Sequence, residues 1–351
     1  MSLTINNVRI AGISACVPKT VEENISLPIF KDKEEAQKVI ASTGIERKRI
    51  SDVNTTTSDM GFAAAKKLIA DLRWEKDSVD CLIFVSQTRD FTVPQTACLL
   101  QDRLGLRNDI FVVDMPIGCS AFVHGLSVIS SLLSHGGLKR GILINGETNT
   151  KNHSMQDRTV RPLFGDAATA TAVEFCDSAK PMHFLFGSDG AGYQAIWAQY
   201  GGFRYPETKE SLEVVEYEEG IAYKGTDVLL NGMDVFGFAI KRPPHSLKQL
   251  IEEFHIDIES VDWLLLHQAN KFIDDKIRES VKIQAEKCPY CLQDFGNVTG
   301  ASIPLVVVSQ IREAVSTKEN HCLACGFGVG LAWATAEIYL DHIVCPELIE
   351  I

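Results

Sequence analysis

The chain has 351 residues, of which 45% are hydrophobic and 23% are charged, a composition typical of a soluble globular protein. Its formal net charge is −12 at pH 7. Because phosphate binding needs a surplus of Lys and Arg, this charge argues against nucleic acid as a partner. It is compatible with an acidic carrier protein, which needs only a local basic patch.

The opening sequence "MSLTINNVRIAGISACVPKT" has no basic region followed by a long apolar one, so we expect no signal peptide. No apolar run reaches the roughly 18 residues that a membrane span needs, so we expect no membrane insertion. Ten cysteines without a secretory signal predict free thiols and a cytoplasmic location.

The first half of the chain alternates between strand and helix patterns. Apolar runs predict strands, several of them buried on both faces, at residues 8–18, 79–88, 109–115, 140–148 and 166–176. Helical periodicity, with Thr or Ser available as caps, predicts helices at residues 56–74, 95–106 and 119–137.

The second half has a similar outline. Its pattern predicts a helix at 233–254 broken at Pro243 and Pro244, a strand at 261–270, helices at 270–281 and 301–315, an extended stretch at 288–294, and a strand, glycine turn and strand at 321–340. Such alternation predicts an α/β fold of mostly parallel sheets covered by helices. Two halves, residues 1–180 and 181–351, indicate a duplication, and the polar stretch near 200–230 is predicted to be an insertion or lid.

Two C-x-x-C pairs, Cys288 with Cys291 and Cys322 with Cys325, raise the alternative of a zinc or redox site. The 30 residues between the pairs exceed the usual zinc-ribbon spacing and include a predicted helix. The second pair lies on a predicted strand, where side chains three positions apart face opposite sides. We therefore expect no metal site and interpret these residues as buried thiols.

Cys119 lies where the strand pattern "VVDM" gives way to a helix pattern. The positive end of a helix dipole favours a thiolate there, and the small neighbours Gly118 and Ser120 leave room for a substrate. The first amides of the helix can also face an oxyanion. The alternative is a small buried thiol at a tight contact between a helix and a strand.

Three further features lie at comparable junctions. His267 ends the apolar run "DWLLLH" and can act as a base or donor, or be a hydrogen-bonded core histidine. Asn297 lies in "FGNVTG" and offers a neutral amide donor, although Gly-Asn is also an ordinary turn pair. The glycines of "GFGVGLAW" can supply a backbone amide to an oxyanion hole.

In combination, these stretches resemble the ketoacyl-ACP synthase III family of thiolase-like condensing enzymes, over nearly the whole chain and in the right order. The most specific stretches are "GCSAF", "HQAN" and "GN" followed by "ASIP". The resemblance implies a duplicated α/β fold of five layers (α-β-α-β-α), a homodimer, and an acyl carrier protein as partner. It implies no cofactor beyond the thioester substrates.

The resemblance also assigns roles by position. Cys119 matches the acyl-accepting nucleophile, and His267 and Asn297 match the pair that holds the carbonyl of a malonyl thioester during decarboxylation. The amides of Gly330 and Cys119 match the oxyanion hole. The expected substrate contacts are Arg158 near the nucleotide entrance, Val93 at the partner's acyl tunnel, and Phe327.

The chain departs from the family pattern at the expected entrance. An aromatic residue and an arginine that usually clamp the CoA adenine are replaced by Lys38 and Ser42, and basic residues usual elsewhere are replaced by Phe272 and Gly237. A specialised pathway therefore stays as open as fatty-acid initiation. Two alternatives to condensation also stay open: acyl transfer from Cys119 to an oxygen or nitrogen acceptor, and a catalytically idle subunit that binds a carrier.

Overall fold

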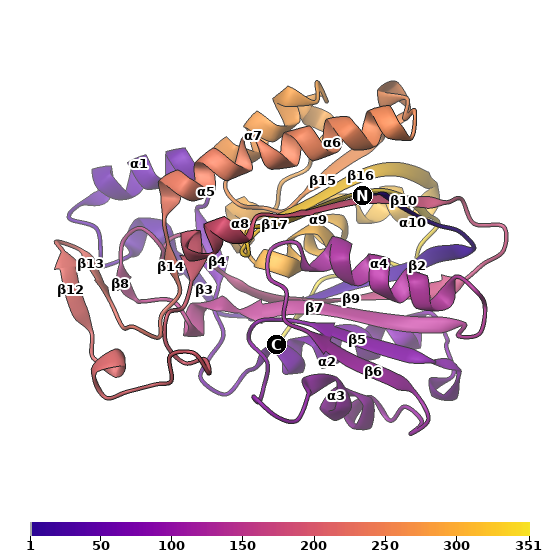
Figure 1. The fold of residues 1–351 in the computed structure, drawn as a ribbon, viewed down its shortest axis with the longest axis horizontal. Coiled ribbons are helices and arrows are strands. Elements are labelled where there is room, and N and C mark those ends of the chain that lie inside the picture. Colours follow the sequence, from indigo (N-terminus) through magenta and orange to yellow (C-terminus); the bar gives the residue numbers. More distant parts are fainter. Residues whose placement is uncertain (1) are drawn as a thin grey trace.

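The computed structural model, which describes residues 2–351, contains two large central sheets (Figure 1). The six-stranded sheet has the order β18-β2-β9-β7-β5-β6. Its strands are β18 (Ile349–Glu350), β2 (Val8–Val17), β9 (Asp166–Phe175), β7 (Arg140–Thr148), β5 (Cys81–Val85) and β6 (Phe111–Met115). The five-stranded sheet has the order β1-β10-β17-β16-β15. Its strands are β1 (Ser2–Ile5), β10 (Met182–Ser188), β17 (Ala332–Asp341), β16 (Glu319–Gly328) and β15 (Trp263–Leu266).

Each end of the chain joins the sheet that the opposite half builds. β1 pairs antiparallel with β10, and β18 pairs parallel with β2. The division predicted at residue 180 falls between β9 and β10 and stays a prediction, because both terminal strands cross it.

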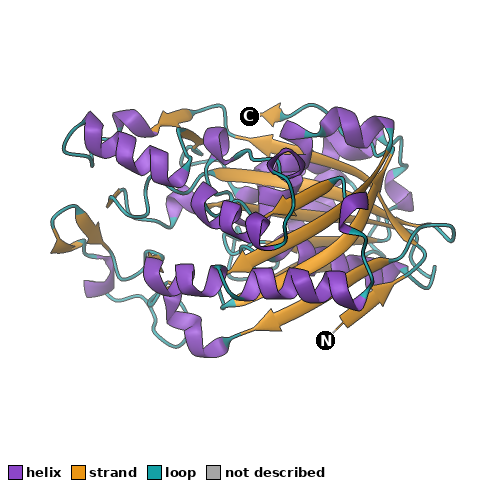
Figure 2. Cartoon of the chain, turned by 90° about the horizontal axis from the view of Figure 1, so that it is seen from above, coloured by secondary structure: helices purple, strands orange, loops and turns teal. Residues whose placement is uncertain are grey.

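Helices form three layers around these sheets, so that the five-layer prediction is confirmed (Figures 1 and 2). Helices α2 (Thr57–Asp71) and α3 (Thr96–Leu104) cover the outer face of the six-stranded sheet. Helices α4 (Ala121–Leu133) and α9 (Ser302–Gln310) lie between the sheets and are buried over most of their length. Helix α6 (Arg242–Glu253) packs on the outer face of the five-stranded sheet, with α7 (Lys271–Ser280) beside it. The apolar "PLVVV" of α9 suits a helix covered on every side.

The prediction of mostly parallel sheets is wrong in its detail, because both sheets are mixed. Parallel pairs join β5 to β6 and to β7, β2 to β18, and β15 to β16, whereas the remaining pairs of the two sheets are antiparallel. A parallel pair needs a crossover, usually through a helix. β16 and β17 are joined by a short turn and β7 and β9 by a connection without an α-helix, so these strands return antiparallel.

Part of the predicted insertion forms a small three-stranded sheet with β8 (Gln156–Asp157) at one end of the molecule (Figure 1). Strands β12 (Val215–Glu218) and β13 (Ile221–Tyr223) pair antiparallel, and β13 also pairs with β8. Strands β11 (Ile196–Trp197) and β14 (Leu229–Leu230) form a second short pair. The break predicted in the helix near Pro243 falls between α5 (Gly232–Ala239) and α6.

The remaining elements are short or connect the layers. They are β3 (Val21–Glu23), α1 (Lys33–Thr43), β4 (Arg47–Arg49), α8 (Leu292–Phe295) and α10 (Arg312–Thr317). No helix within residues 2–351 combines the length and the hydropathy of a membrane span.

Candidate active site

Cys119 lies one residue before the N-cap of α4, in the short link that follows β6. The end of β16 packs directly against it, since a Cβ built on Gly328 would lie 2.6 Å from both Cβ and Sγ of Cys119. A Cβ on Gly326 would lie 2.8 Å from Cα of Ser120. The small residues of "GCS" and "GFG" are therefore required by a close approach of two backbones, one from each half of the chain.

Burial raises the pKa of the Cys119 thiol to about 11. The backbone N–H of Val329 opposes this by donating to the sulfur, and the negative charge of Glu147 adds to it. Burial therefore raises the pKa of this thiol by more than the start of α4 was expected to lower it. Ionisation of this thiol needs a base nearby.

Two backbone amides lie at the sulfur, those of Cys119 itself and of Val329. Val329 lines the same cavity as Cys119, whereas Gly330 does not. The geometry therefore favours Val329 over the predicted Gly330 as the source of the second oxyanion-hole amide. Val329 and Gly330 lie in the turn between β16 and β17, where the chain changes direction, and of the two only the N–H of Val329 reaches the sulfur.

His267 follows the end of β15 and is buried, with 2% of its surface exposed. Its Nδ1 lies 3.2 Å from the carbonyl oxygen of Thr299 and 3.2 Å from Oγ of Ser302. The hydroxyl of Ser302 donates its only proton to the Thr299 carbonyl at 2.5 Å, so both groups accept from Nδ1. This assigns the proton of the neutral ring to Nδ1 and leaves Nε2 as an acceptor.

Burial lowers the pKa of His267 to about 4, and the hydrogen bond to the Thr299 carbonyl opposes this only in part. Thr299 has a φ of 46°, a left-handed conformation that costs a β-branched residue on the order of 1–3 kcal/mol. This strained residue is the one whose carbonyl orients the imidazole. The ring is thus held neutral and in one orientation.

Asn297 is 6% exposed, and its backbone N–H donates to the Leu163 carbonyl at 2.8 Å. Its side-chain Oδ1 accepts from the backbone N–H of Thr299 at 2.9 Å. Because the oxygen is occupied in this way, the NH₂ group is the part of the amide left to act as a donor.

One cavity of about 790 Å³ brings the three predicted residues together. Cys119, His267 and Asn297 all line it, and so does Phe327, whose ring meets His267 edge-on at 5.4 Å between centroids. A Cβ on Gly300 would lie 3.1 Å from the Gly118 carbonyl oxygen, so the Thr299 turn packs on the start of α4. This contact is what places the second-half residues beside the first-half nucleophile.

The other predicted substrate contacts do not line this cavity. Arg158 follows β8 between two residues that do line it; its guanidinium lies 3.6 Å from Glu35, and its backbone N–H donates to Gly220 at 3.0 Å. Val93 is 81% exposed on the loop between β5 and α3. The ion pair with Glu35 neutralises the charge of Arg158, and the sequence pattern around Arg158 does not predict this pair.

The sequence pattern did not single out Glu147, Gln87, His153 and Phe164. Glu147 is a buried carboxylate on β7, and the other three line the cavity. A glutamate inside the apolar run "GILINGET" is an available signal, since buried carboxylates are rare without a specific partner.

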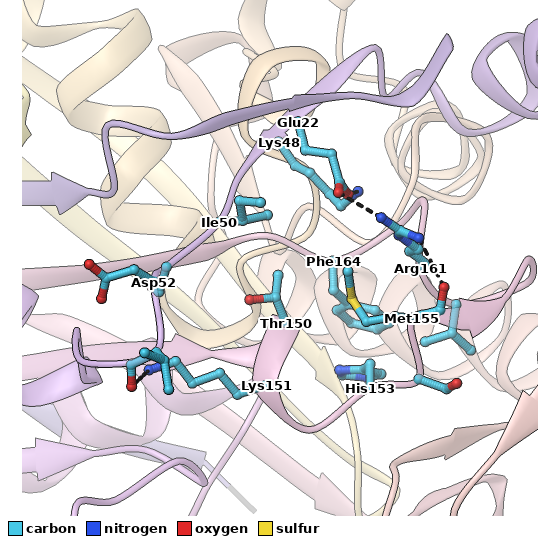
Figure 3. Close-up of a pocket in the computed structure, with 14 residues that line it drawn as sticks. Glu22, Lys48, Ile50, Asp52, Thr150, Lys151, His153, Met155, Arg161 and Phe164 are labelled. Carbon is cyan, nitrogen blue, oxygen red and sulfur yellow. Dashed lines mark hydrogen bonds and ion pairs between the residues drawn. The ribbon is translucent and has the colours of Figure 1, made fainter. Parts of the chain in front are cut away.

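A second cavity, of about 400 Å³, is drawn in Figure 3. The side chains of His153 and Phe164 line both this cavity and the first one, so the two cavities lie side by side. Their rings stack with 4.2 Å between centroids and 17° between planes. One end of this second cavity carries the ion cluster of Lys48, Glu22 and Arg161 (Figure 3). The wall between the two cavities is therefore a single layer of side chains.

The C-x-x-C pairs do not form a cluster. Cys322 and Cys325 contribute to different hydrophobic clusters on opposite faces of β16, and Cys288 and Cys291 are divided in the same way. All ten cysteines are free. Across residues 2–351, the structure groups no three His, Cys, Asp or Glu side chains in a way that could hold a metal ion.

The layered fold and this cavity define a thiolase-like condensing enzyme. The family model of 3-oxoacyl-[acyl-carrier-protein (ACP)] synthase III matches residues 113–190, and the model of its C-terminal part matches residues 251–340. A beta-ketoacyl-[acyl-carrier-protein] synthase III of Clostridium perfringens is 32% identical over 96% of this chain and 100% of its own length. The chain therefore belongs to the 3-oxoacyl-[acyl-carrier-protein] synthase III family.

Solved structures agree with this assignment. A 3-oxoacyl-(acyl-carrier protein) synthase from Burkholderia xenovorans superposes with a TM-score of 0.94 at 31% identity, covering 100% of this chain and 99% of the other. The priming beta-ketosynthase of the R1128 polyketide pathway superposes with a TM-score of 0.82 at 21% identity, covering 97% of this chain and 98% of the other, which shows a shared fold alone.

Proposed function

We propose that the protein is an acyltransferase that forms carbon–carbon bonds in two half-reactions through Cys119, with a malonyl thioester of an acyl carrier protein as the second substrate. The observation that carries the proposal is the single cavity lined by Cys119, His267 and Asn297, with two backbone amides at the sulfur. No group outside the chain and its thioester substrates enters this proposal.

In the first half-reaction, Nε2 of His267 accepts the thiol proton, and the sulfur of Cys119 attacks the carbonyl carbon of an acyl thioester. The amides of Cys119 and Val329 stabilise the tetrahedral oxyanion. The donor's carbon–sulfur bond then breaks, and the departing thiolate takes the proton from Nε2 of His267. The acyl group remains on Cys119, and the His267 ring is neutral again.

In the second half-reaction, the malonyl thioester carbonyl accepts a hydrogen bond from the NH₂ group of Asn297, beside the neutral ring of His267. The bond to the carboxylate breaks, carbon dioxide leaves, and the electron pair forms an enolate that the Asn297 amide stabilises. The enolate carbon attacks the acyl group on Cys119, and the carbon–sulfur bond breaks. The Cys119 sulfur takes a proton from water, and a 3-oxoacyl thioester is released.

Two variants test this scheme. Cys119→Ala is expected to abolish acyl-enzyme formation, measured by intact-protein mass spectrometry over a panel of acyl-CoA and acyl-carrier donors. Asn297→Ala is expected to acylate but to lose decarboxylation of the malonyl thioester. Unimpaired condensation by either variant contradicts the proposal, and a product that has gained the acyl group on oxygen or nitrogen, with no carbon dioxide released, favours heteroatom transfer instead.

We also propose that the protein forms a homodimer in the cytoplasm. Strand β6 ends the six-stranded sheet, and Phe111 on it is 46% exposed. A sheet edge with an exposed aromatic residue is a surface that a second copy can pair with, and ten free thiols suit a reducing compartment. Sedimentation at the mass of one 38.7 kDa chain would contradict the dimer.

A further inference from the structure

A buried carboxylate, Glu147, holds the segment that follows β5. Glu147 is 1% exposed and accepts hydrogen bonds from the backbone N–H groups of Gln87 at 2.9 Å and Thr88 at 3.0 Å. The hydroxyls of Thr88, at 2.7 Å, and Ser86, at 3.2 Å, donate to the same carboxylate. Four hydrogen bonds, donated by three consecutive residues to one carboxylate, fix the conformation of this segment.

The segment held in this way forms part of the cavity wall beside the nucleophile. Gln87 lines the cavity together with Cys119. A Cβ on Gly118 would collide with Oε1 of Gln87, so the Gln87 side chain rests directly on the residue that precedes Cys119. A movement of the segment would therefore move the wall against which the nucleophile is placed.

Glu147 also acts on Cys119 through its charge. The negative charge adds to the effect of burial in raising the pKa of the thiol. Burial raises the pKa of Glu147 itself to about 7, while its four hydrogen bonds oppose that rise. Glu147 does not line the cavity, whereas His267, from the segment after β15, lines it together with Cys119.

We propose that Glu147 is a positioning residue of this active site: it holds Ser86–Thr88 so that the Gln87 side chain supports the residue that precedes the nucleophile. The inference rests on the proposed function in taking Cys119 as the nucleophile. The role of Glu147 can be tested separately from the proposed condensation, because the reaction of the Cys119 thiol with an alkylating agent needs no acyl donor.

The test uses Glu147→Gln, which removes the charge and keeps the size, and Glu147→Asp, which keeps the charge and shortens the side chain. Iodoacetamide modification of the peptide that contains Cys119 is followed by mass spectrometry across a pH series. For Glu147→Gln we expect faster modification than in the wild type, most clearly above pH 7 where Glu147 is ionised, because a charge that raises the pKa of the thiol is removed. For Glu147→Asp we expect the wild-type pH profile of alkylation, because the charge is kept, but acylation slowed at least tenfold, because the shorter side chain no longer holds the segment. A carboxylate that only stabilised the fold would change the alkylation profile and the acylation rate together.

Glu337→Gln serves as the control, because Glu337 is 5% exposed and accepts from His183 at 2.6 Å and from His321 at 2.7 Å outside the catalytic cavity. It is expected to change neither the profile nor the acylation rate. A folded Glu147→Gln variant with the wild-type profile overturns the charge effect, and wild-type acylation by Glu147→Asp overturns the positioning. If Glu147→Gln does not fold, the acylation rate of the double variant Glu147→Asp with Gln87→Ala is compared with the rates of the two single variants. A double variant that is no slower than Glu147→Asp alone supports the proposal, because both changes then act through Gln87. Losses of rate that add up in the double variant overturn it.

If no donor acylates the wild-type protein, the proposed condensation fails, while the alkylation profiles still confirm or overturn the charge effect of Glu147 on Cys119. The two failures are therefore distinguishable.

Discussion

Replacement of Gly328 by alanine is a sharp test of the close approach at Cys119. Gly328 has a φ of +153°, a backbone conformation that side-chain-bearing residues rarely adopt. The new Cβ would lie 2.6 Å from Cβ and Sγ of Cys119, where an ordinary contact begins at 3.4 Å. The sulfur must therefore move by about 0.8 Å or the end of β16 must withdraw. A misplacement of about 1 Å at a reacting group costs roughly 100-fold in rate.

We expect Gly328→Ala to slow acylation of Cys119 about 100-fold, with a loss of stability of roughly 1–3 kcal/mol from the backbone strain. The assay is intact-protein mass spectrometry with a donor that acylates the wild-type protein, combined with thermal unfolding. Gly137→Ala is the control, because a Cβ there meets no atom within 4 Å, and it should acylate normally. A folded Gly328→Ala variant that acylates within about threefold of the wild-type rate would refute the contact.

Two further predictions concern pH and cavity shape. The pKa of His267 is about 4 in the fold against an ordinary value of 6.5, so the unfolded chain binds a proton more readily. The stability that this residue contributes is present above pH 6.5 and falls, by up to about 3 kcal/mol, as pH drops toward 4. In urea unfolding, His267→Gln should therefore lose less stability over that interval than the wild type; an equal loss would contradict the buried neutral ring. Phe164→Ala should join the cavities of about 790 and 400 Å³ and extend acylation to longer acyl chains, at a cost of roughly 3 kcal/mol. An unchanged chain-length profile in the folded variant would show that the wall does not limit the acyl group.

Much of the fold followed from local patterns. Apolar runs of strand length and helical periodicity placed the main elements of both sheets and of the buried helices α4 and α9. Strand direction did not follow, because it depends on how the chain returns between strands. The run at residues 140–148 is as apolar as a parallel strand, yet β7 pairs antiparallel with β9 on one side.

The candidate site could also be predicted in part from local patterns in the sequence. Cys119, His267 and Asn297 each stand at a junction between elements, where a reactive side chain is visible in the sequence. The amide of Val329 was missed by one residue, since neither amide of "GVG" carries a side-chain signal and only the fold decides which one faces the sulfur. Arg158 carried a motif, but the approach of Glu35, 123 positions away, is not encoded near it.

By itself, then, the sequence determined which chemical groups are available and at which ends of strands and helices they stand, because burial patterns and small-residue junctions are local along the chain. The tertiary structure decided how those groups behave. It selected the Nδ1 tautomer of His267 through Thr299 and Ser302, turned Asn297 into a donor, and raised the pKa of Cys119 above its ordinary value. These properties depend on burial and on contacts between residues distant in sequence, and such contacts exist only once the two halves have packed together.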